Sequence, residues 1–175
     1  MKEVEVKILD IDREEIEKKL VALGAEKTFE GEMTAIYWDF PDKSLRANKR
    51  TFRLRQEGDT TKLTFKTRVK HQHMKVNREE EVTISDFETM QYIFRSIGLR
   101  TNLRTVKDRV SYQYKDIKFE IDDYTGNFGY IPVFLEIEGE NEEAVEKIVK
   151  KLGYTMNDCK PFSTNDLILH YRNTL

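Results

Sequence analysis

The chain has 175 residues, of which 38% are hydrophobic and 35% are charged. This length suits a single domain over residues 1–175 with a hydrophobic core, and the charged fraction exceeds the roughly 25% typical of globular proteins. The 30 Lys and Arg residues almost balance the 32 Asp and Glu residues, leaving a formal net charge of −2. That balance disfavours a broad basic surface for duplex nucleic acid.

Membrane and secretory signals are missing from the sequence. No apolar run reaches the roughly 20 residues that a membrane-spanning helix needs, and the first residues form no apolar signal segment. Cys159 is the only cysteine, so the chain cannot form an internal disulfide. We therefore expect a cytoplasmic protein that does not associate with membranes.

The first half of the chain predicts a strand, a helix and four further strands. Strict alternation predicts a strand at 2–9, and the helix after it has Asp12 as N-cap and ends at Gly24. The later strands are expected at 34–40, 50–57, 60–68 and 76–84, with an exposed loop at 69–75.

The second half repeats the alternation of strands and capped helices. The helices are expected to begin after Ser85, Asn141 and Ser163, and the first two to end at Gly98 and Gly153. The strands are expected at 103–114, 117–124 and 131–139, with a flexible loop at 126–129.

Charged residues of one sign recur two positions apart on nearly every predicted strand. Such residues point to the same face of a strand, about 6.5–7 Å apart. The acidic sets are Glu3 and Glu5, Glu79 and Glu81, Glu120 and Asp122, and Glu136 and Glu138. The basic sets are Arg53 and Arg55, Lys66 and Arg68, and Lys107 and Arg109, with Lys62 four residues before Lys66 on the same face.

Two arrangements can accommodate these charged faces. An ordinary antiparallel sheet would expose them on a solvated outer face. However, like charges opposite each other are unfavourable, and three amphipathic helices need apolar strand faces to cover. If the helices pack outside, the charged faces line the water-filled interior of a curved or closed sheet. There, Arg and Lys would complement phosphates, and carboxylates would complement Mg²⁺ or Mn²⁺.

The order of these motifs resembles that of the CYTH superfamily, which includes class IV adenylyl cyclases, thiamine triphosphatases and inorganic triphosphatases. The stretch from Glu3 to Lys7 resembles the ExExK signature of the superfamily. The later matching segments are Phe52–Arg55, Leu63–Lys66, Lys107–Arg109, Glu120–Asp122 and Phe134–Glu138. Ser163–Leu167 resembles a C-terminal helix of the cyclase-like branch.

The resemblance implies an α+β fold, an eight-stranded antiparallel β-barrel with a polar lumen and helices packed outside. It implies a role for Lys7 near the reacting phosphate, as the catalytic residue. It implies metal binding by Glu3, Glu5, Glu120, Asp122, Glu136 and Glu138. It implies triphosphate binding by Arg53, Arg55, Lys66, Lys107 and Arg109, with Lys62 added because it shares a face with Lys66.

Five further residues are candidates, each with an alternative interpretation. A one-residue shift in the segment from Arg78 to Glu81 would turn Glu79 and Glu81 outward, although the repeated Glu-x-Glu pattern favours an inward position for both. Tyr37 either touches the substrate or packs. His71 and His73 could bind a surface metal, but a solvated loop is the simpler interpretation.

The resemblance leaves three functions open. The first is a phosphohydrolase that uses Mg²⁺ or Mn²⁺ on a nucleoside, thiamine or inorganic triphosphate. The second is a class IV adenylyl cyclase, which converts ATP to cyclic AMP and pyrophosphate with the same apparatus. The third is a binder of polyphosphate or of RNA 5′-triphosphate ends without catalysis. The expected partner is a small-molecule triphosphate, and a homodimer is a family-level expectation.

Overall fold

The computed structural model describes residues 2–69 and 74–173. The strands are β1 (Lys2–Ile8), β2 (Glu26–Asp39), β3 (Arg50–Glu57), β4 (Thr60–Val69), β5 (Lys75–Ile84), β6 (Arg100–Tyr114), β7 (Ile117–Tyr124), β8 (Phe134–Gly139) and β9 (Cys159–Lys160). The helices are α1 (Arg13–Leu23), α2 (Ser44–Ala47), α3 (Phe87–Ser96), α4 (Glu142–Lys151) and α5 (Thr164–Arg172), with a 3-10 turn at Gly126–Phe128.

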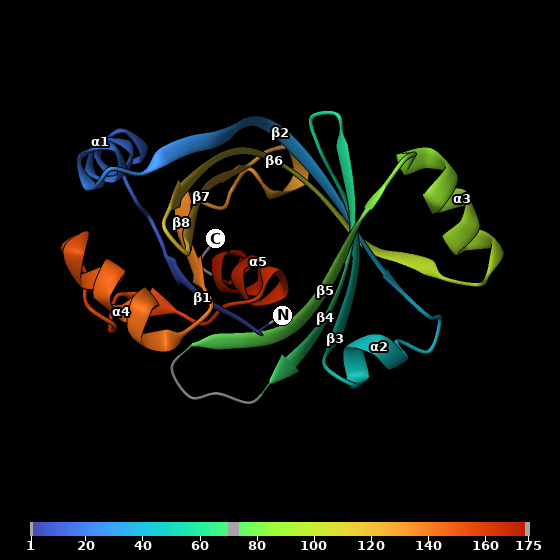
Figure 1. Cartoon of the computed structure of the whole chain (residues 1–175). Coiled ribbons are helices and arrows are strands. Elements are labelled where there is room, and N and C mark those ends of the chain that lie inside the picture. The colour runs from blue at the N-terminus through green and yellow to red at the C-terminus, as the bar shows by residue number, and fades with distance from the viewer. Residues whose placement is uncertain (1, 70–73, 174–175) are drawn as a thin grey trace.

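Eight of the strands close into a barrel (Figure 1). The sheet order is β5-β4-β3-β2-β6-β7-β8-β1, every pair is antiparallel, and pairing between β1 and β5 closes the ring. Beyond its pairing with β5, the same edge of β1 pairs with β9. The expected eight-stranded antiparallel barrel and the α+β class are therefore confirmed.

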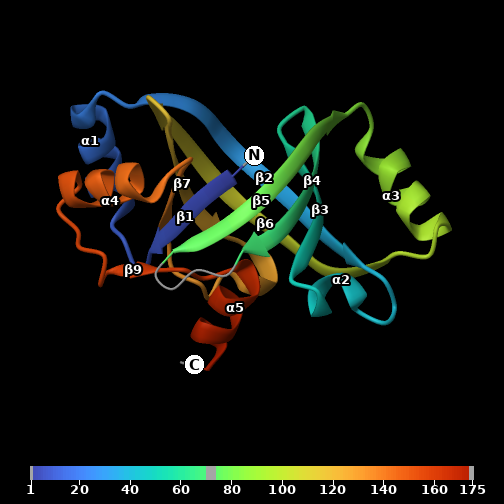
Figure 2. The ribbon, with the colours of Figure 1, turned by 60° about the horizontal axis from the view of Figure 1, so that its bottom comes forward.

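The helices lie outside the barrel, as expected. Figures 1 and 2 show α1 and α4 on one side, α3 on the opposite side, and α5 across one end. No helix in the described ranges is both long and apolar enough to cross a membrane.

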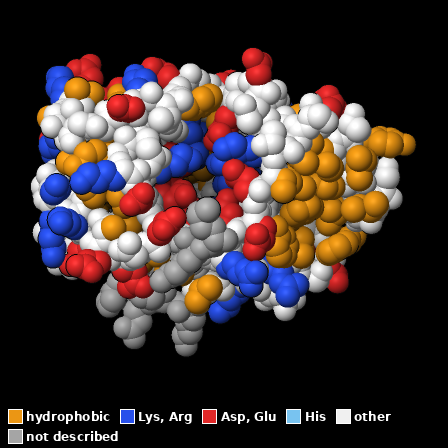
Figure 3. Space-filling view, in the orientation of Figure 1, with side chains coloured by type: hydrophobic (Ala, Val, Ile, Leu, Met, Phe, Trp, Pro, Cys, Tyr) orange, Lys and Arg blue, Asp and Glu red, His pale blue; other side chains and the backbone are white. Residues whose placement is uncertain are grey.

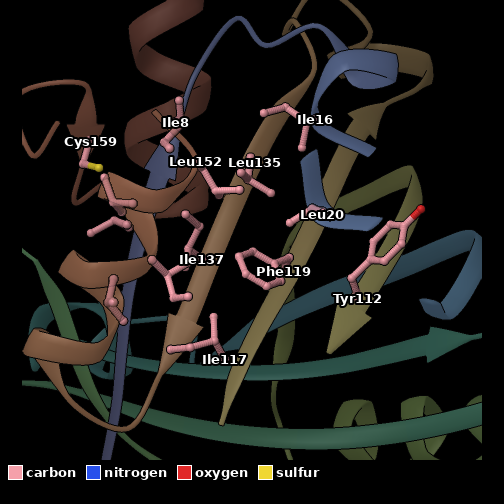
Figure 4. Close-up of a cluster of buried hydrophobic side chains, with 14 of the residues drawn as sticks. Ile8, Ile16, Leu20, Tyr112, Ile117, Phe119, Leu135, Ile137, Leu152 and Cys159 are labelled. Carbon is pink, nitrogen blue, oxygen red and sulfur yellow. The ribbon is translucent and has the colours of Figure 1, made fainter. Parts of the chain in front are cut away.

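The alternation of β1 explains why its charges face inward. Val4, Val6 and Ile8 are buried beneath α1 and α4 in the largest apolar cluster. Figure 4 shows Ile16 and Leu20 of α1 in this cluster, near Phe119 and Leu135 of the sheet. Each such side chain stabilises the fold by roughly 1.5–3 kcal/mol when fully buried. The residues between them in β1 must then point into the barrel.

Two smaller apolar clusters attach the other helices. Phe87 and Phe94 of α3 pack with Trp38 and Leu54, and the Phe94 ring meets the Trp38 ring edge-on at 5.4 Å between centroids. Leu167 of α5 is fully buried in the third cluster, which also contains Phe134 of β8. Leu167 therefore anchors α5 at the end of the barrel.

The helix caps agree with the sequence analysis except at α3. Asp12 caps α1, Asn141 caps α4, and Ser163 forms a capping box with Asp166. The prediction of Ser85 for α3 is wrong by one residue. Asp86 is the cap, because its carboxylate accepts from the Thr89 amide at 2.6 Å.

Strand boundaries differ where long-range pairing outweighs local composition. The polar start of β2, from Glu26, pairs with the end of β6, so β2 begins well before the expected residue 34. Lys75 belongs to β5 and pairs with Glu5, whereas a loop was expected there. β8 begins at Phe134 rather than at residue 131, because Ile131 packs in the third cluster and Pro132 has no amide to donate. His71 and His73 lie outside the described residues.

Candidate metal and phosphate site inside the barrel

The inward strand faces enclose a polar cavity of about 180 Å³. This volume is far above the ~10–15 Å³ that one water needs, so the charged groups around it can be hydrated. Figure 3 shows acidic and basic side chains together in the hollowed centre of this face. The predicted site residues in the cavity wall are Glu3, Glu5, Lys7, Tyr37, Arg53, Arg55, Lys62, Lys66, Glu79, Glu81, Lys107, Arg109, Glu120, Glu136 and Glu138.

Three glutamates converge on one side of the cavity. Glu120 of β7 lies directly opposite Glu136 of β8, and Glu138 shares the inward face of β8. Carboxylate oxygens of the three lie within 4.8 Å of one another. Like charges in this arrangement repel, and three carboxylates are the donor set that a hard divalent cation takes. The cluster therefore fits Mg²⁺ or Mn²⁺.

Glu138 shows the electrostatic strain of this cluster. Burial, together with the charges of Glu3 and Glu120, raises the pKa of Glu138 from its ordinary value of 4.5 to about 8. By contrast, burial disfavours ionisation of Glu120, but the positive charges of Arg109 and Lys118 outweigh it. They hold the pKa of Glu120 well below its ordinary value. The cluster thus combines one carboxyl group of raised pKa with two carboxyl groups of lowered pKa.

Glu3 and Glu5 lie in the wall but are bound by lysines. Lys66 donates to both carboxylate oxygens of Glu3 at 2.7 Å. Lys7 and Lys75 donate to Glu5 at 2.9 and 2.7 Å. Burial opposes ionisation of Glu5, yet these two lysines lower its pKa to about 2. Burial raises the pKa of Glu3 despite the charge of Lys66. Both carboxylates thus border the acidic cluster as partners of lysines, and Glu5 lies opposite Glu138.

Asp122 is the one predicted site residue that the structure places behind the cavity wall. Its side chain is fully buried and accepts from Arg109 at 2.7 and 2.8 Å, and also from Lys107. A bidentate contact of this kind fixes the orientation of a guanidinium group. The geometry therefore makes Asp122 the counter-ion that orients two cations.

Strands β3, β4 and β5 supply the basic wall and its counter-ions. Arg55 donates to Glu81 at 3.0 Å, and Lys66 lies 2.6 Å from Glu79. The structure thus places Glu79 and Glu81 on the inward face. The buried Nε atoms of Arg53 and Arg55 have no hydrogen-bond partner among the described residues. These two N–H groups are therefore unsatisfied within the described part of the chain.

Lys7 connects the acidic residues of two strands. Its ammonium group lies 2.9 Å from Glu5 and 2.5 Å from Glu136. Burial opposes the charge, but Glu136 and Glu5 raise the pKa of Lys7 well above its ordinary value. Lys7 therefore acts as a fixed cation and not as a proton acceptor.

Tyr37 contacts the helix that covers the end of the barrel. Its hydroxyl is 3.0 Å from the Thr164 hydroxyl at the start of α5. Burial would raise the pKa of Tyr37, but the positive charge of Arg53 lowers it. Tyr37 thus links α5 to the basic wall.

Sequence reasoning missed several residues of the wall. They are Thr51, Lys75, Asn77, Lys118, Tyr124, Phe134, Ser163, Thr164 and Asn165. Alternation could have found Lys118, two residues before Glu120, and Asn77, two residues before Glu79. The sequence marks Ser163 as a helix cap, but it does not place Ser163 to Asn165 at the cavity, because only the docking of α5 brings them there.

Known proteins share this fold and parts of this sequence. A Methanocaldococcus jannaschii protein, provisionally named an adenylate cyclase, is 30% identical over 147 residues, which cover 84% of this chain and 82% of the relative. A Pyrococcus horikoshii structure is 26% identical with a TM-score of 0.76 and covers 96% of this chain and 98% of its own. A Hippeastrum structure is 16% identical with a TM-score of 0.70, covering 96% and 95%, and that protein is described as having a dominant triphosphatase activity.

The CYTH domain pattern matches residues 1–165, which include all the barrel strands and the acidic cluster. The chain therefore belongs to the CYTH domain family of metal-dependent enzymes, triphosphatases or adenylate cyclases that act on triphosphate compounds.

Proposed function

We propose that this protein is a metal-dependent triphosphatase that hydrolyses a nucleoside, thiamine or inorganic triphosphate inside the barrel. The observation that carries the proposal is that one cavity holds three converging glutamates on β7 and β8 and, on β3, two arginines whose Nε atoms have no hydrogen-bond partner among the described residues. A metal–triphosphate complex complements both sides. The dominant triphosphatase activity described for the Hippeastrum relative also favours this reaction.

The basic residues of the wall, with Asp122 behind them, would bind and orient the triphosphate. Arg53 and Arg55 would bind phosphoryl oxygens and hold the chain of phosphates in line. Asp122 would keep Lys107 and Arg109 aimed at the leaving oxygens, where charge develops. Lys7, which stays protonated, would neutralise the phosphoryl group that is attacked.

The acidic cluster would hold the cation. Glu120, Glu136 and Glu138 are the ligands proposed for Mg²⁺ or Mn²⁺, which when bound supplies charge neutralisation and an activated water. Attack of water at the terminal phosphorus forms a new P–O bond, breaks the bridging P–O bond and releases orthophosphate. Glu3 and Glu5 would keep the neighbouring lysines ionised and in place.

The cyclase reaction has less support from the described wall residues. A cyclase must hold the adenine ring, usually against an open aromatic face. Tyr124 and Phe134 are buried and packed together with ring centroids 5.9 Å apart, and Tyr37 is hydrogen-bonded to Thr164. We therefore rank cyclisation second, despite the name of the Methanocaldococcus relative.

A single product assay separates these reactions. The protein is incubated with inorganic triphosphate, thiamine triphosphate or ATP, each with Mg²⁺ or Mn²⁺. We expect orthophosphate and the matching diphosphate compound, and no product in EDTA. Cyclic AMP with pyrophosphate would replace the proposal by cyclisation, and binding without turnover would replace it by a non-catalytic role.

The acidic cluster is tested with a matched pair of variants. Glu136→Gln should lower metal-dependent turnover by at least about 100-fold, because one charged ligand is lost. Glu80→Gln is the control, since Glu80 is exposed on the outer face of β5 and, among the residues that the structure describes, forms an ion pair only with Arg78. Equal turnover of the two variants, both folded, would show that the cluster is not the metal site.

A further inference from the structure

We call the polar cavity inside the barrel the tunnel. A second cavity of about 400 Å³ adjoins it at the end covered by α5. We call it the vestibule. Its wall comprises Arg46, Lys49, Arg50, Thr51, Arg68, Lys75, Asn77, Ser163, Asn165 and Asp166. Five of these residues, Thr51, Lys75, Asn77, Ser163 and Asn165, also line the tunnel. Figure 2 shows α2 and α5 at the same end of the barrel. The vestibule therefore continues the tunnel outward.

The charge of the vestibule differs from that of the tunnel. Five of its residues are Lys or Arg and one, Asp166, is acidic, whereas the tunnel wall mixes both signs. Arg46, Lys49 and Arg50 are exposed, and no ion pair or side-chain hydrogen bond joins them to any residue within 2–69 or 74–173. Unpaired cations around one hollow repel each other and are relieved by an anion.

The rim that carries these cations is held in place. The buried carboxylate of Asp39 accepts from the Leu45 and Arg46 amides, each at 3.0 Å. Lys49 has a left-handed φ of 56°, its amide donates to the Arg46 carbonyl, and its carbonyl accepts from the Arg68 amide at 3.0 Å. A non-glycine residue in this conformation costs energy that surrounding contacts must offset. The cations are thus presented on a fixed turn, which lowers the ordering cost of binding.

The passage between the two cavities also contains an unpaired donor. Asn77 lies on β5 opposite Glu3 and is only 2% exposed. Its Nδ2 atom has no hydrogen-bond partner among the described residues. A buried amide without a partner costs about 1–3 kcal/mol. An oxygen of a ligand passing from tunnel to vestibule would satisfy it.

The side-chain types point to one class of ligand. The described wall of the vestibule contains no aromatic or aliphatic side chain, only cations, hydroxyls, amides and one carboxylate. Single-stranded RNA and nucleosides are usually bound through aromatic stacking of their bases. The wall instead suits a chain made of phosphoryl groups alone.

We propose that the vestibule binds phosphoryl groups beyond the three held in the tunnel, so that the protein prefers linear inorganic polyphosphate longer than triphosphate. The chain would run from the arginines of the tunnel, past Asn77, to Arg46, Lys49 and Arg50. This preference rests on the proposed function, because it assumes that the tunnel holds a triphosphate.

Equilibrium binding tests the preference without relying on turnover. Calorimetry in EDTA compares triphosphate with a medium-chain linear polyphosphate, for the wild type and for Lys49→Asn. Asparagine removes the charge but tolerates the left-handed turn. We expect Lys49→Asn to weaken binding of the long chain about tenfold, equivalent to ~1.4 kcal/mol, and to leave triphosphate binding within about twofold. A double variant, Arg46→Gln with Arg50→Gln, should weaken the long chain further.

Lys43→Asn is the matched control. Lys43 also has a left-handed φ, of 58°, and flanks the other end of α2, but it does not line the vestibule. It should leave both affinities unchanged. An equal loss of polyphosphate affinity in the Lys43 and Lys49 variants, or no loss in either, would contradict the proposal that the vestibule binds polyphosphate.

The assay also keeps the two proposals apart. A wild type that hydrolyses no triphosphate but binds the long chain through Lys49 contradicts the triphosphatase and supports the vestibule. A 5′-triphosphorylated RNA oligonucleotide is the competing ligand. If Lys49→Asn weakens that RNA more than it weakens polyphosphate, the polyphosphate preference is wrong.

Discussion

At the scale of single residues, Glu138 and Glu5 have opposite effects on stability. The pKa of Glu138 is raised to about 8 in the folded protein, chiefly by burial, so its ionisation destabilises the fold. The pKa of Glu5 is lowered to about 2, because Lys7 and Lys75 outweigh burial, so its ionisation stabilises the fold. Without metal, stability should fall as pH rises from about 4.5 to 8 through Glu138, and as pH falls from about 4.5 to 2 through Glu5.

Glu138→Gln tests this pH dependence. In EDTA at pH 9 the variant should be more stable than the wild type by roughly 1–3 kcal/mol, because it removes a charge that burial and the nearby charges of Glu3 and Glu120 disfavour. At pH 5, where Glu138 is mostly protonated, the two should be nearly equal. Urea unfolding at both pH values measures the difference. The same difference at pH 5 and pH 9 would contradict the raised pKa.

Asp122 is the residue whose neutralisation should damage the fold most. Asp122→Asn leaves Lys107 and Arg109 buried without their shared counter-ion, a loss that typically costs 3–5 kcal/mol. Asp123→Asn is the control, because Asp123 points to the other face of β7. Thermal unfolding compares the two. A small effect of Asp122→Asn, matching the control, would mean that these cations do not depend on Asp122.

At the scale of elements, strand alternation accounts for what could be read from the sequence. Residues two apart share a face, so the inward set of β1, β3 and β8 was predictable once the apolar faces were assigned to the helices. The role of Asp122 as a counter-ion was not, because it depends on the register of β6 against β7. The length of β2 could not be predicted either, because only pairing with β6 makes the polar segment that begins at Glu26 a strand. The part of the wall that α5 supplies was not predictable, because it depends on how α5 packs against residues that are distant in the sequence.

Helix α5 depends on one buried side chain for its position. Leu167→Ala should destabilise the protein by about 2–5 kcal/mol and loosen α5, which carries Thr164, the partner of Tyr37. We expect faster hydrogen exchange in residues 164–172 than in the barrel strands, and weaker triphosphate binding. Leu169→Ala, at an exposed position on the same helix, should change neither. Unchanged exchange in the Leu167 variant would mean that other contacts hold α5.

At the scale of the whole molecule, the barrel explains where the charges of a chain that is 35% charged yet nearly neutral can lie. The apolar strand faces are covered by helices from outside, and the charged faces enclose a hydrated space. Within that space the acidic cluster lies on β7 and β8 and the two arginines lie on β3, although both groups also form ion pairs within the wall. The same separation predicts that metal and phosphates bind together better than either binds alone.

The most direct test of this arrangement is a crystal structure with Mn²⁺ and a slowly hydrolysed triphosphate analogue, in which anomalous scattering locates the metal. We predict Mn²⁺ on Glu120, Glu136 and Glu138, with phosphoryl oxygens within hydrogen-bonding distance of Arg53 and Arg55. Metal or phosphates bound only on the outer surface, with the barrel holding neither, would contradict the account.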